Sequence, residues 1–295
     1  MKIVVTTPTG NIGSKLSELL LDAGQNVVIV ARDSKKVAGL VEQGAEVIEG
    51  SHADPELMKT ATRDVDALFF IAPPDFGSED LVADYRVFAE AAAEAISANQ
   101  IPYVVHLSSV GADVDGGNGP VLGLHHNEKI LAAAAKNIVQ LRPGYFMENT
   151  LMQVGSIKES SAMFTTFKGD TRIPMIATAD IAAAAAELLI NPNWEGEKIV
   201  ELQGAADISY DEVAEQLTEV LGKPVTHMTI SNEQLKEGLA QMGASAHMGD
   251  LLAELSEGVE SGHVAFHQPR DAKTSTATNY RMFAESVFKK VLEYA

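Results

Sequence analysis

The segment Thr6–Gly13 constrains the fold of this chain more than any other part of the sequence. It follows a short apolar run, Lys2–Thr6, which is typical of a buried strand. It precedes an amphipathic helix, and small residues between a strand and a helix let a pyrophosphate approach the helix N-terminus. We therefore expect a dinucleotide-binding βαβ unit here, whose helix packs through an apolar face of Ile12, Leu16, Leu19, Leu20 and Ala23.

One position in this segment departs from the usual pattern. Thr7 stands where a glycine would make the tight turn, and a β-branched residue at positive φ is costly. Pro8 favours an extended conformation for the residue before it and supplies no N–H donor. We expect Thr7 to stay extended, and the phosphates to be bound more weakly than by a glycine-complete loop. The expected cofactor contacts in this loop are Thr7, Thr9, Gly10, Asn11, Ile12 and Gly13.

Strands and helices alternate through the first half of the chain with a period of roughly 35 residues, which indicates a parallel sheet with crossover helices. Ser34 is expected to cap a helix that Gly44 ends, and two later helices are expected at 78–99 and around 127–135. The pattern predicts an α/β fold with a Rossmann-type doubly wound parallel sheet. Its expected strands are Lys2–Thr6, Asn26–Ala31, Glu46–Ile48, Ala67–Ile71, Pro102–Leu107 and Ile138–Leu141.

The second half of the chain changes character and predicts a smaller, mainly helical C-terminal lobe. An alanine-rich helix is expected at Ala177–Ile190, followed by one more strand of the main sheet at Ile199–Leu202. Capping boxes at Ser209–Glu212 and Ser231–Gln234 open further helices. We expect residues 1–150 to form the dinucleotide-binding domain, with about 177–204 returning to it, and 151–295 to form the substrate-binding lobe.

Composition excludes several functions. The formal net charge of −19 disfavours binding to nucleic acid or to an anionic membrane surface. The sequence contains no cysteine, which removes disulfides, thiolate catalysis and cysteine-ligated metals. The N-terminus lacks a signal-peptide pattern, so a cytoplasmic location is expected. No metal site is expected, because five of the histidines are scattered along the chain without carboxylates at the spacing of metal ligands. They are His52, His227, His247, His263 and His267.

The end of the second strand indicates which dinucleotide the chain binds. An acidic residue there usually holds the ribose 2′-hydroxyl of NAD, whereas an arginine accommodates the 2′-phosphate of NADP. This chain has Arg32 at that place, with Lys35 and Lys36 just beyond, and Asp33 is one position late. We therefore expect NADP(H), held in part by Arg32 and Lys36. The acidic helix 251–260 is either a surface helix or a contact in a homodimer.

Several motifs resemble those of the NmrA-like group of atypical short-chain dehydrogenases/reductases. They are Thr9–Gly13, Val30–Asp33, Leu107–Ala112, Leu141–Asn149 and Asp180-Ile181, and the resemblance extends to 274–283. It implies the Rossmann-type fold and NADP binding. Members include NADPH-dependent reductases of quinones, dyes and other small molecules, and also proteins that bind NADP as redox sensors. Further expected cofactor contacts are Ala72, Pro73, Ser108, Lys129, Pro143 and Phe146.

The Tyr-x-x-x-Lys pair of typical short-chain dehydrogenases is missing, because none of the six tyrosines has a lysine four residues later. His125 and Lys129 stand in the corresponding region at helical i, i+4 spacing. His125 is the candidate proton donor, with His126 as competitor, while Lys129 would hold the ribose and Ser108 or Ser109 would polarise the substrate. Tyr145 is a further candidate donor. An electron-poor acceptor would need no protein acid at all.

Two functions follow from these observations. The first is an NADPH-dependent reductase of a small electron-poor compound such as a quinone. The second is a non-catalytic NADP(H) sensor, which the missing tyrosine favours. An apolar pocket wall is plausible at Phe146, Met147, Met152, Phe164 and Phe167, although core packing explains these residues equally well.

Overall fold

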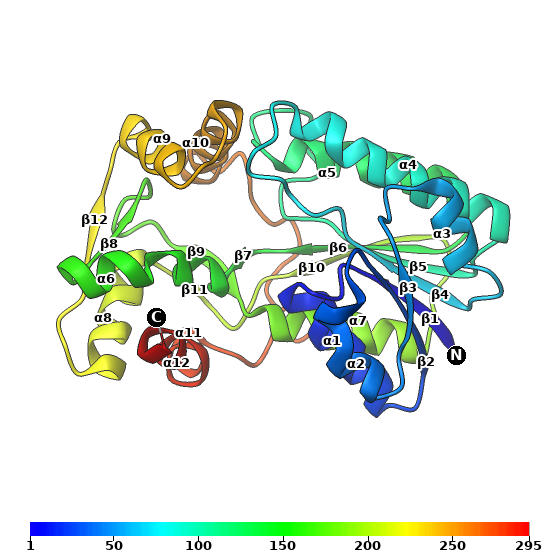
Figure 1. Ribbon diagram of the computed structural model, residues 1–295. Helices are drawn as coiled ribbons and strands as arrows, with labels where there is room; N and C mark the ends of the chain where they lie inside the picture. The colour runs from blue at the N-terminus through cyan, green and yellow to red at the C-terminus, as the bar shows by residue number, and fades with distance from the viewer. Residues whose placement is uncertain (295) are drawn as a thin grey trace.

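A seven-stranded sheet forms the centre of the computed structural model, which describes residues 1–294 (Figure 1). All pairings within this sheet are parallel. Its strand order is β10-β6-β5-β4-β1-β2-β3, so the chain winds outward in both directions from β1 and β4, as the doubly wound pattern predicts. The strands are β1 (Lys2–Thr6), β2 (Asn26–Ala31), β3 (Glu46–Glu49), β4 (Ala67–Phe70), β5 (Tyr103–Leu107), β6 (Ile138–Pro143) and β10 (Glu197–Leu202).

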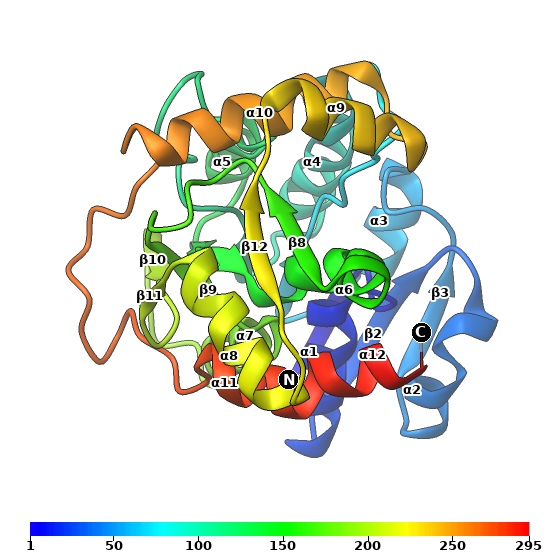
Figure 2. The ribbon, with the colours of Figure 1, turned by 90° about the vertical axis from the view of Figure 1, so that its left-hand side faces the viewer.

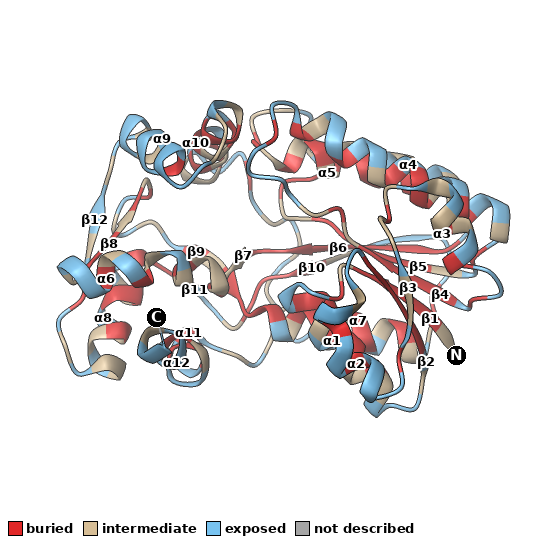
Figure 3. Cartoon of the chain, in the orientation of Figure 1, coloured by how far each residue is buried: buried red, intermediate tan, exposed pale blue. Residues whose placement is uncertain are grey.

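Helices cover both faces of this sheet, and the five inner strands are accordingly buried, whereas the edge strands β3 and β10 are largely exposed (Figure 3). One face packs against α1 (Asn11–Asp22), α2 (Ala38–Glu42) and α7 (Thr178–Ile190). The other packs against α3 (Pro55–Ala61), α4 (Leu81–Asn99) and α5 (Val121–Ala134). Successive residues of β1 alternate between the two cores, since Ile3 and Val5 belong to the first and Val4 to the second.

One expectation about the helical segment that follows β2 is wrong. Ser34 does not cap it: the carboxylate of Asp33 accepts a hydrogen bond from the Lys35 N–H at 3.0 Å, and the Ser34 N–H donates to Glu49 at 3.1 Å. Asp33 is extended, which lets its side chain reach the amide two residues on. A short 3₁₀ helix, η1 (Ser34–Val37), therefore precedes α2.

The lobe lies beyond the carboxyl ends of the strands and has its own core (Figure 1). Its helices are joined by two small sheets that the sequence does not predict, β11-β9-β7 and β12-β8. The capping boxes at Ser209 and Ser231 are confirmed. The lobe elements are β7 (Tyr145–Phe146), η2 (Met147–Gln153), α6 (Val154–Ser160), β8 (Ala162–Thr165), β9 (Ile173–Ile176), β11 (Asp207–Ile208), α8 (Tyr210–Leu221), β12 (Thr226–Thr229), α9 (Asn232–Gln241), α10 (Ala246–Glu260), α11 (Tyr280–Phe283), η3 (Ala284–Phe288) and α12 (Lys289–Tyr294).

A long irregular segment, residues 261–279, connects α10 to α11 and is called the strap below. Figure 2 shows it in orange beside β10 and β11. The Glu201 carboxylate of β10 accepts hydrogen bonds from the strap amides of His267 and Gln268, and the Gln203 N–H donates to the Thr274 carbonyl. These bonds fasten the strap to the edge of the main sheet. Within residues 1–294, no helix is both long and apolar enough to cross a bilayer.

Candidate active site

The turn between β1 and α1 is the tightest part of the site. A Cβ added to Gly13 would lie 2.3 Å from the Thr7 carbonyl oxygen, so only glycine lets the helix approach the strand this closely. The expectation that Thr7 stays extended is wrong, because its φ is +53°. The Gly10 N–H donates to the Thr7 carbonyl at 3.1 Å. Closing this turn requires the left-handed conformation at Thr7 and compensates its free-energy cost of about 1–2 kcal/mol. The Thr7 hydroxyl adds a bond of 2.8 Å to the Thr6 carbonyl.

The first turn of α1 presents backbone donors to the outside. Gly10 is the N-cap and offers no side-chain acceptor, and the first intrahelical bond runs from the Ser14 N–H to the Gly10 carbonyl at 2.9 Å. By helix geometry, the amides of Asn11, Ile12 and Gly13 therefore have no partner in the helix. Thr9, Gly10 and Asn11 are exposed, so this end of the helix can accept an anion.

The carboxyl ends of the central strands meet at the same edge as this turn. The Thr6 hydroxyl accepts a hydrogen bond from the Ile71 N–H at 2.9 Å, which ties the end of β1 to the end of β4. The Ser108 N–H donates to Leu141 and the Val110 N–H donates to Pro143, which ties β5 to β6. The strands β6-β5-β4-β1-β2 are parallel, so their carboxyl ends lie on the same side of the sheet as the phosphate loop and Arg32. Five predicted cofactor residues follow these strand ends: Ala72, Pro73, Ser108, Pro143 and Phe146.

A basic cluster follows β2. Arg32, Lys35 and Lys36 are exposed, and Arg32 forms no ion pair with any residue in the range 1–294. Asp33 caps η1 instead of facing a ribose. His52 lies near Arg32, and its pKa is lowered to about 4, by burial first and by the Arg32 charge last. The imidazole of His52 is therefore neutral at physiological pH and adds no second positive charge beside Arg32.

A buried hydroxyl at the end of β5 lacks a hydrogen-bond partner within the described part of the chain. Ser108 is 3% exposed, and its hydroxyl contacts no hydrogen-bonding group among residues 1–294. Such an orphaned group is costly unless a bound molecule satisfies it. Tyr145 lies in β7 against the rings of Phe167 and Tyr210, and burial raises the pKa of its phenol. Met147 and Phe167 belong to the lobe core, whereas Met152 is half exposed.

The histidines expected near the catalytic position lie in the first turns of α5. His125 is buried, and its Nδ1 lies 2.8 Å from the Ala112 carbonyl oxygen. Only an N–H pairs with a carbonyl oxygen, so the proton of the neutral ring is on Nδ1 and Nε2 carries a lone pair. His126 is partly exposed. Lys129 shares the i, i+4 spacing with His125 but is exposed, while the neighbouring Asn127 and Glu128 are buried.

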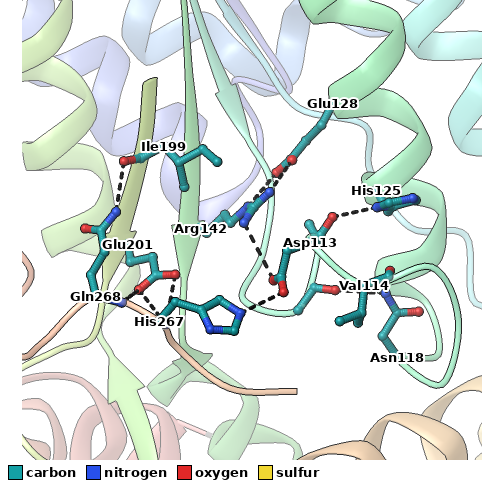
Figure 4. A network of polar contacts seen from close by, with 12 residues as sticks. Asp113, Val114, Asn118, His125, Glu128, Arg142, Ile199, Glu201, His267 and Gln268 are labelled. Atoms are coloured by element: carbon teal, nitrogen blue, oxygen red, sulfur yellow. Dashed lines mark hydrogen bonds and ion pairs between the residues drawn. The ribbon is translucent and has the colours of Figure 1, made fainter. Parts of the chain in front are cut away.

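A polar network beneath α5, buried at Arg142 and Glu128 and exposed at Asp113 and His267, has no counterpart in the sequence predictions (Figure 4). The Arg142 guanidinium donates to both oxygens of Glu128, at 2.9 and 2.6 Å, and lies 3.6 Å from Asp113. Asp113 in turn accepts from His267 of the strap at 2.8 Å. Polar residues inside an otherwise apolar strand, Gln140 and Arg142 of β6, are the sequence signal that could have revealed it. The network joins α5, β6 and the strap on one side of the site.

Comparisons with known proteins identify one matching family and several relatives of this chain. A model described as the NmrA-like family matches residues 1–280. The chain is 28% identical to an NAD(P)H azoreductase of Xenophilus azovorans over 253 residues, which covers 86% of this chain and 85% of the relative. It is 27% identical to quinone oxidoreductase 2 of Escherichia coli (strain K12) over 266 residues, 88% of each chain.

Solved structures agree in fold. The chain is similar to an NADPH-dependent quinone oxidoreductase of Escherichia coli complexed with NADPH, with a TM-score of 0.82 and 24% identity over 98% of this chain and 100% of that one. It is also similar to a triphenylmethane reductase of Citrobacter sp. complexed with NADP(H), with a TM-score of 0.76 and 22% identity over 99% of each chain. These likenesses confirm the Rossmann-type sheet with its C-terminal lobe.

Proposed function

The chain belongs to the NmrA-like family, and we propose that it is an NADPH-dependent oxidoreductase that reduces a small electron-poor organic compound such as a quinone. The observation that carries the proposal is the open first turn of α1, whose free amides lie at the same sheet edge as the unpaired charge of Arg32. The names of the azoreductase and quinone oxidoreductase relatives support an acceptor of this class.

The residues at the strand ends fit a dinucleotide that carries a 2′-phosphate. In the proposed complex, the amides of Asn11, Ile12 and Gly13 hold the pyrophosphate, as helix N-termini do. Arg32 pairs with the 2′-phosphate, with Lys36 as a second cation. The orphaned hydroxyl of Ser108 donates a hydrogen bond to the bound nicotinamide or to the substrate. Pro143 and Phe146 form the apolar wall at the end of β6.

NADPH supplies a hydride, and the chain positions the acceptor to receive it. Two observations argue against a dedicated protein acid. The sequence lacks the Tyr-x-x-x-Lys pair, and Lys129 is exposed. We propose that a quinone-like acceptor takes the hydride first and collects its proton from water. Ser108 and the protonated phenol of Tyr145 are the polar groups that orient it.

The decisive experiment measures NADPH oxidation by purified protein against benzoquinone, an azo dye, a triphenylmethane dye and a saturated ketone. The quinone and at least one dye are expected to be reduced, and the ketone is not, because an alkoxide needs a proton donor as it forms. Tight NADPH binding without turnover of any acceptor would instead assign a non-catalytic NADP(H) sensor. Turnover of the ketone would restore a protein acid to the mechanism.

A further inference from the structure

Three side chains with metal-ligating atoms converge where the loop after β5 meets the first turns of α5. Asp115 belongs to this loop, and His125 and His126 are consecutive in the helix. The Asp115 Oδ1 atom lies 3.8 Å from the Nε2 atom of His125 and 3.9 Å from that of His126. Each of the three atoms lies within 4.8 Å of the other two.

His125 has the orientation of a prepared ligand. Its side chain is 8% exposed, and its Nδ1–H is fixed by the Ala112 carbonyl at 2.8 Å. The Nε2 lone pair is buried and has no hydrogen-bond partner among residues 1–294. Metal-binding histidines typically donate their second ring N–H to a carbonyl or carboxylate, which fixes the tautomer and aims the other nitrogen at the metal. A buried unpartnered lone pair beside a carboxylate that cannot donate to it is explained by a cation between them.

We propose that Asp115, His125 and His126 bind a divalent transition-metal ion of the Zn²⁺ class. Two imidazole nitrogens and one carboxylate oxygen are a set that Zn²⁺ and its first-row neighbours accept, and three protein ligands leave a fourth position for water. Bond lengths of about 2.0–2.2 Å place tetrahedral ligand atoms about 3.4 Å apart. The two Asp115–histidine distances must therefore contract by about half an ångström, and the distance between the two histidine nitrogens, which is within 4.8 Å, by at most about 1.4 Å. The exposed Asp115 and the 40% exposed His126 give an ion access from solvent.

Two other histidine–carboxylate pairs differ from the Asp115 group in their hydrogen bonding. His267 lies 2.8 Å from Asp113, a direct hydrogen bond that involves one imidazole only. His227 uses both ring nitrogens, one with Thr165 and one with Asp211. Within residues 1–294, only the Asp115 group assembles three such ligands. The geometry therefore separates this group from ordinary surface pairs.

The test is a titration of untagged, EDTA-treated, full-length protein with Co²⁺ in the absence of NADPH. Co²⁺ bound by nitrogen and oxygen ligands gives a visible absorption, which is expected to saturate at one ion per chain and to disappear when Zn²⁺ is added. His126→Ala and Asp115→Asn each remove one ligand at an accessible position, and each is expected to weaken binding at least about tenfold. His267→Ala, which removes a histidine from a two-member pair, is expected to bind Co²⁺ like the native protein.

A titration without saturable absorption, or equal Co²⁺ affinity in His126→Ala and native protein, would overturn the metal site. Circular dichroism of each variant shows whether it is folded before its titration is compared. The readout uses neither NADPH nor an acceptor, so it is independent of the reductase proposal. A metal-binding protein that reduces nothing would contradict only the proposed function, and a reductase that ignores Co²⁺ would contradict only this site.

Discussion

Arg142 and Glu128 form a bidentate ion pair inside the protein, with both side chains more than nine-tenths buried. Both charges have left water, so removing one partner leaves the other unpaired in a poorly solvating interior. The pair also connects the end of β6 to the middle of α5, the two elements that flank the candidate active site.

Glu128→Gln is expected to lower the free energy of unfolding by about 3 kcal/mol, because it removes the bidentate counter-charge and leaves the buried guanidinium with only Asp113, 3.6 Å away. Urea denaturation measures the change. The control is Glu90→Gln, which removes an exposed helical pair with Arg86 and should cost at most about 0.5 kcal/mol. Equal effects of the two substitutions would show that the buried pair contributes no more than a surface one.

Thr7→Gly is expected to raise the free energy of unfolding by about 1 kcal/mol, since glycine adopts the left-handed conformation without steric cost. The same backbone geometry already exists with threonine, so NADPH affinity should change by less than about threefold. Thermal denaturation and fluorescence titration with NADPH measure the two quantities. A lower stability would mean that the Thr7 hydroxyl bond to Thr6 outweighs the backbone strain.

Arg32→Glu is expected to weaken NADPH binding by about 10–100-fold, because a charge-assisted bond to the 2′-phosphate is replaced by repulsion. NADH, which lacks this phosphate, should lose little affinity. Isothermal titration with both nucleotides gives the comparison. Arg86→Glu reverses a charge on the exposed face of α4 and serves as the control. Equal losses for NADPH and NADH would refute the assignment of Arg32.

His125→Gln is expected to leave the kcat of quinone reduction within about threefold of the native value, because the proton comes from water. Loss of a true general acid would cost about 10²–10⁴-fold. Stopped-flow oxidation of NADPH in the presence of EDTA separates these outcomes and keeps metal ions out of the comparison. A large fall in kcat with an unchanged Kd for NADPH would identify His125 as the proton donor.

Acidification is expected to destabilise the protein through His52. Burial lowers the pKa of this imidazole from 6.5 to about 4 in the folded state. The unfolded state binds a proton below about pH 6.5 and the folded state does not, so stability falls as the pH drops from 6.5 to 4 and is unaffected by this group above that window. The contribution is about 2 kcal/mol between pH 6.5 and 4.5.

The check is the pH dependence of urea denaturation for native protein and His52→Gln, whose amide can still donate to the Ile71 carbonyl. The variant should lose less stability than the native protein between pH 7.5 and 4.5. Identical pH profiles would mean that His52 titrates normally in the folded state.

The sheet could be predicted from the sequence because its inner strands are short apolar runs bounded by turn residues, and such local patterns survive in the fold. The strand expected at Ile199–Leu202 joins the main sheet, where it pairs with β6. The Thr7 conformation could not be predicted from local preferences, since they oppose it. The approach of α1 to β1 across Gly13 overrides them, and that contact is tertiary.

The site was accessible to sequence reasoning only in part. Strand ends determine which residues lie at the carboxyl end of the sheet, so the positions of Arg32 and Ser108 follow from counting strands, and their contacts with the cofactor stay predictions. The partners of a buried charge do not, because Arg142 meets Glu128 from 14 residues away and Asp113 meets the strap 154 residues later. Asp115 was missed as a partner of His125 and His126 because an irregular loop, without periodicity, brings it back to the helix.

The route of the chain between the main sheet and the lobe has a mechanical consequence. The chain enters the lobe after β6, returns through α7 to β10, leaves again at β11 and is finally bound along the sheet edge by the strap. A lobe attached through a single linker can rotate about that linker, whereas a lobe connected to the main sheet by several chain segments cannot. Displacement of the lobe relative to the main sheet is therefore restricted to small movements, and a proteolytic nick in the strap is not expected to release the lobe as a fragment.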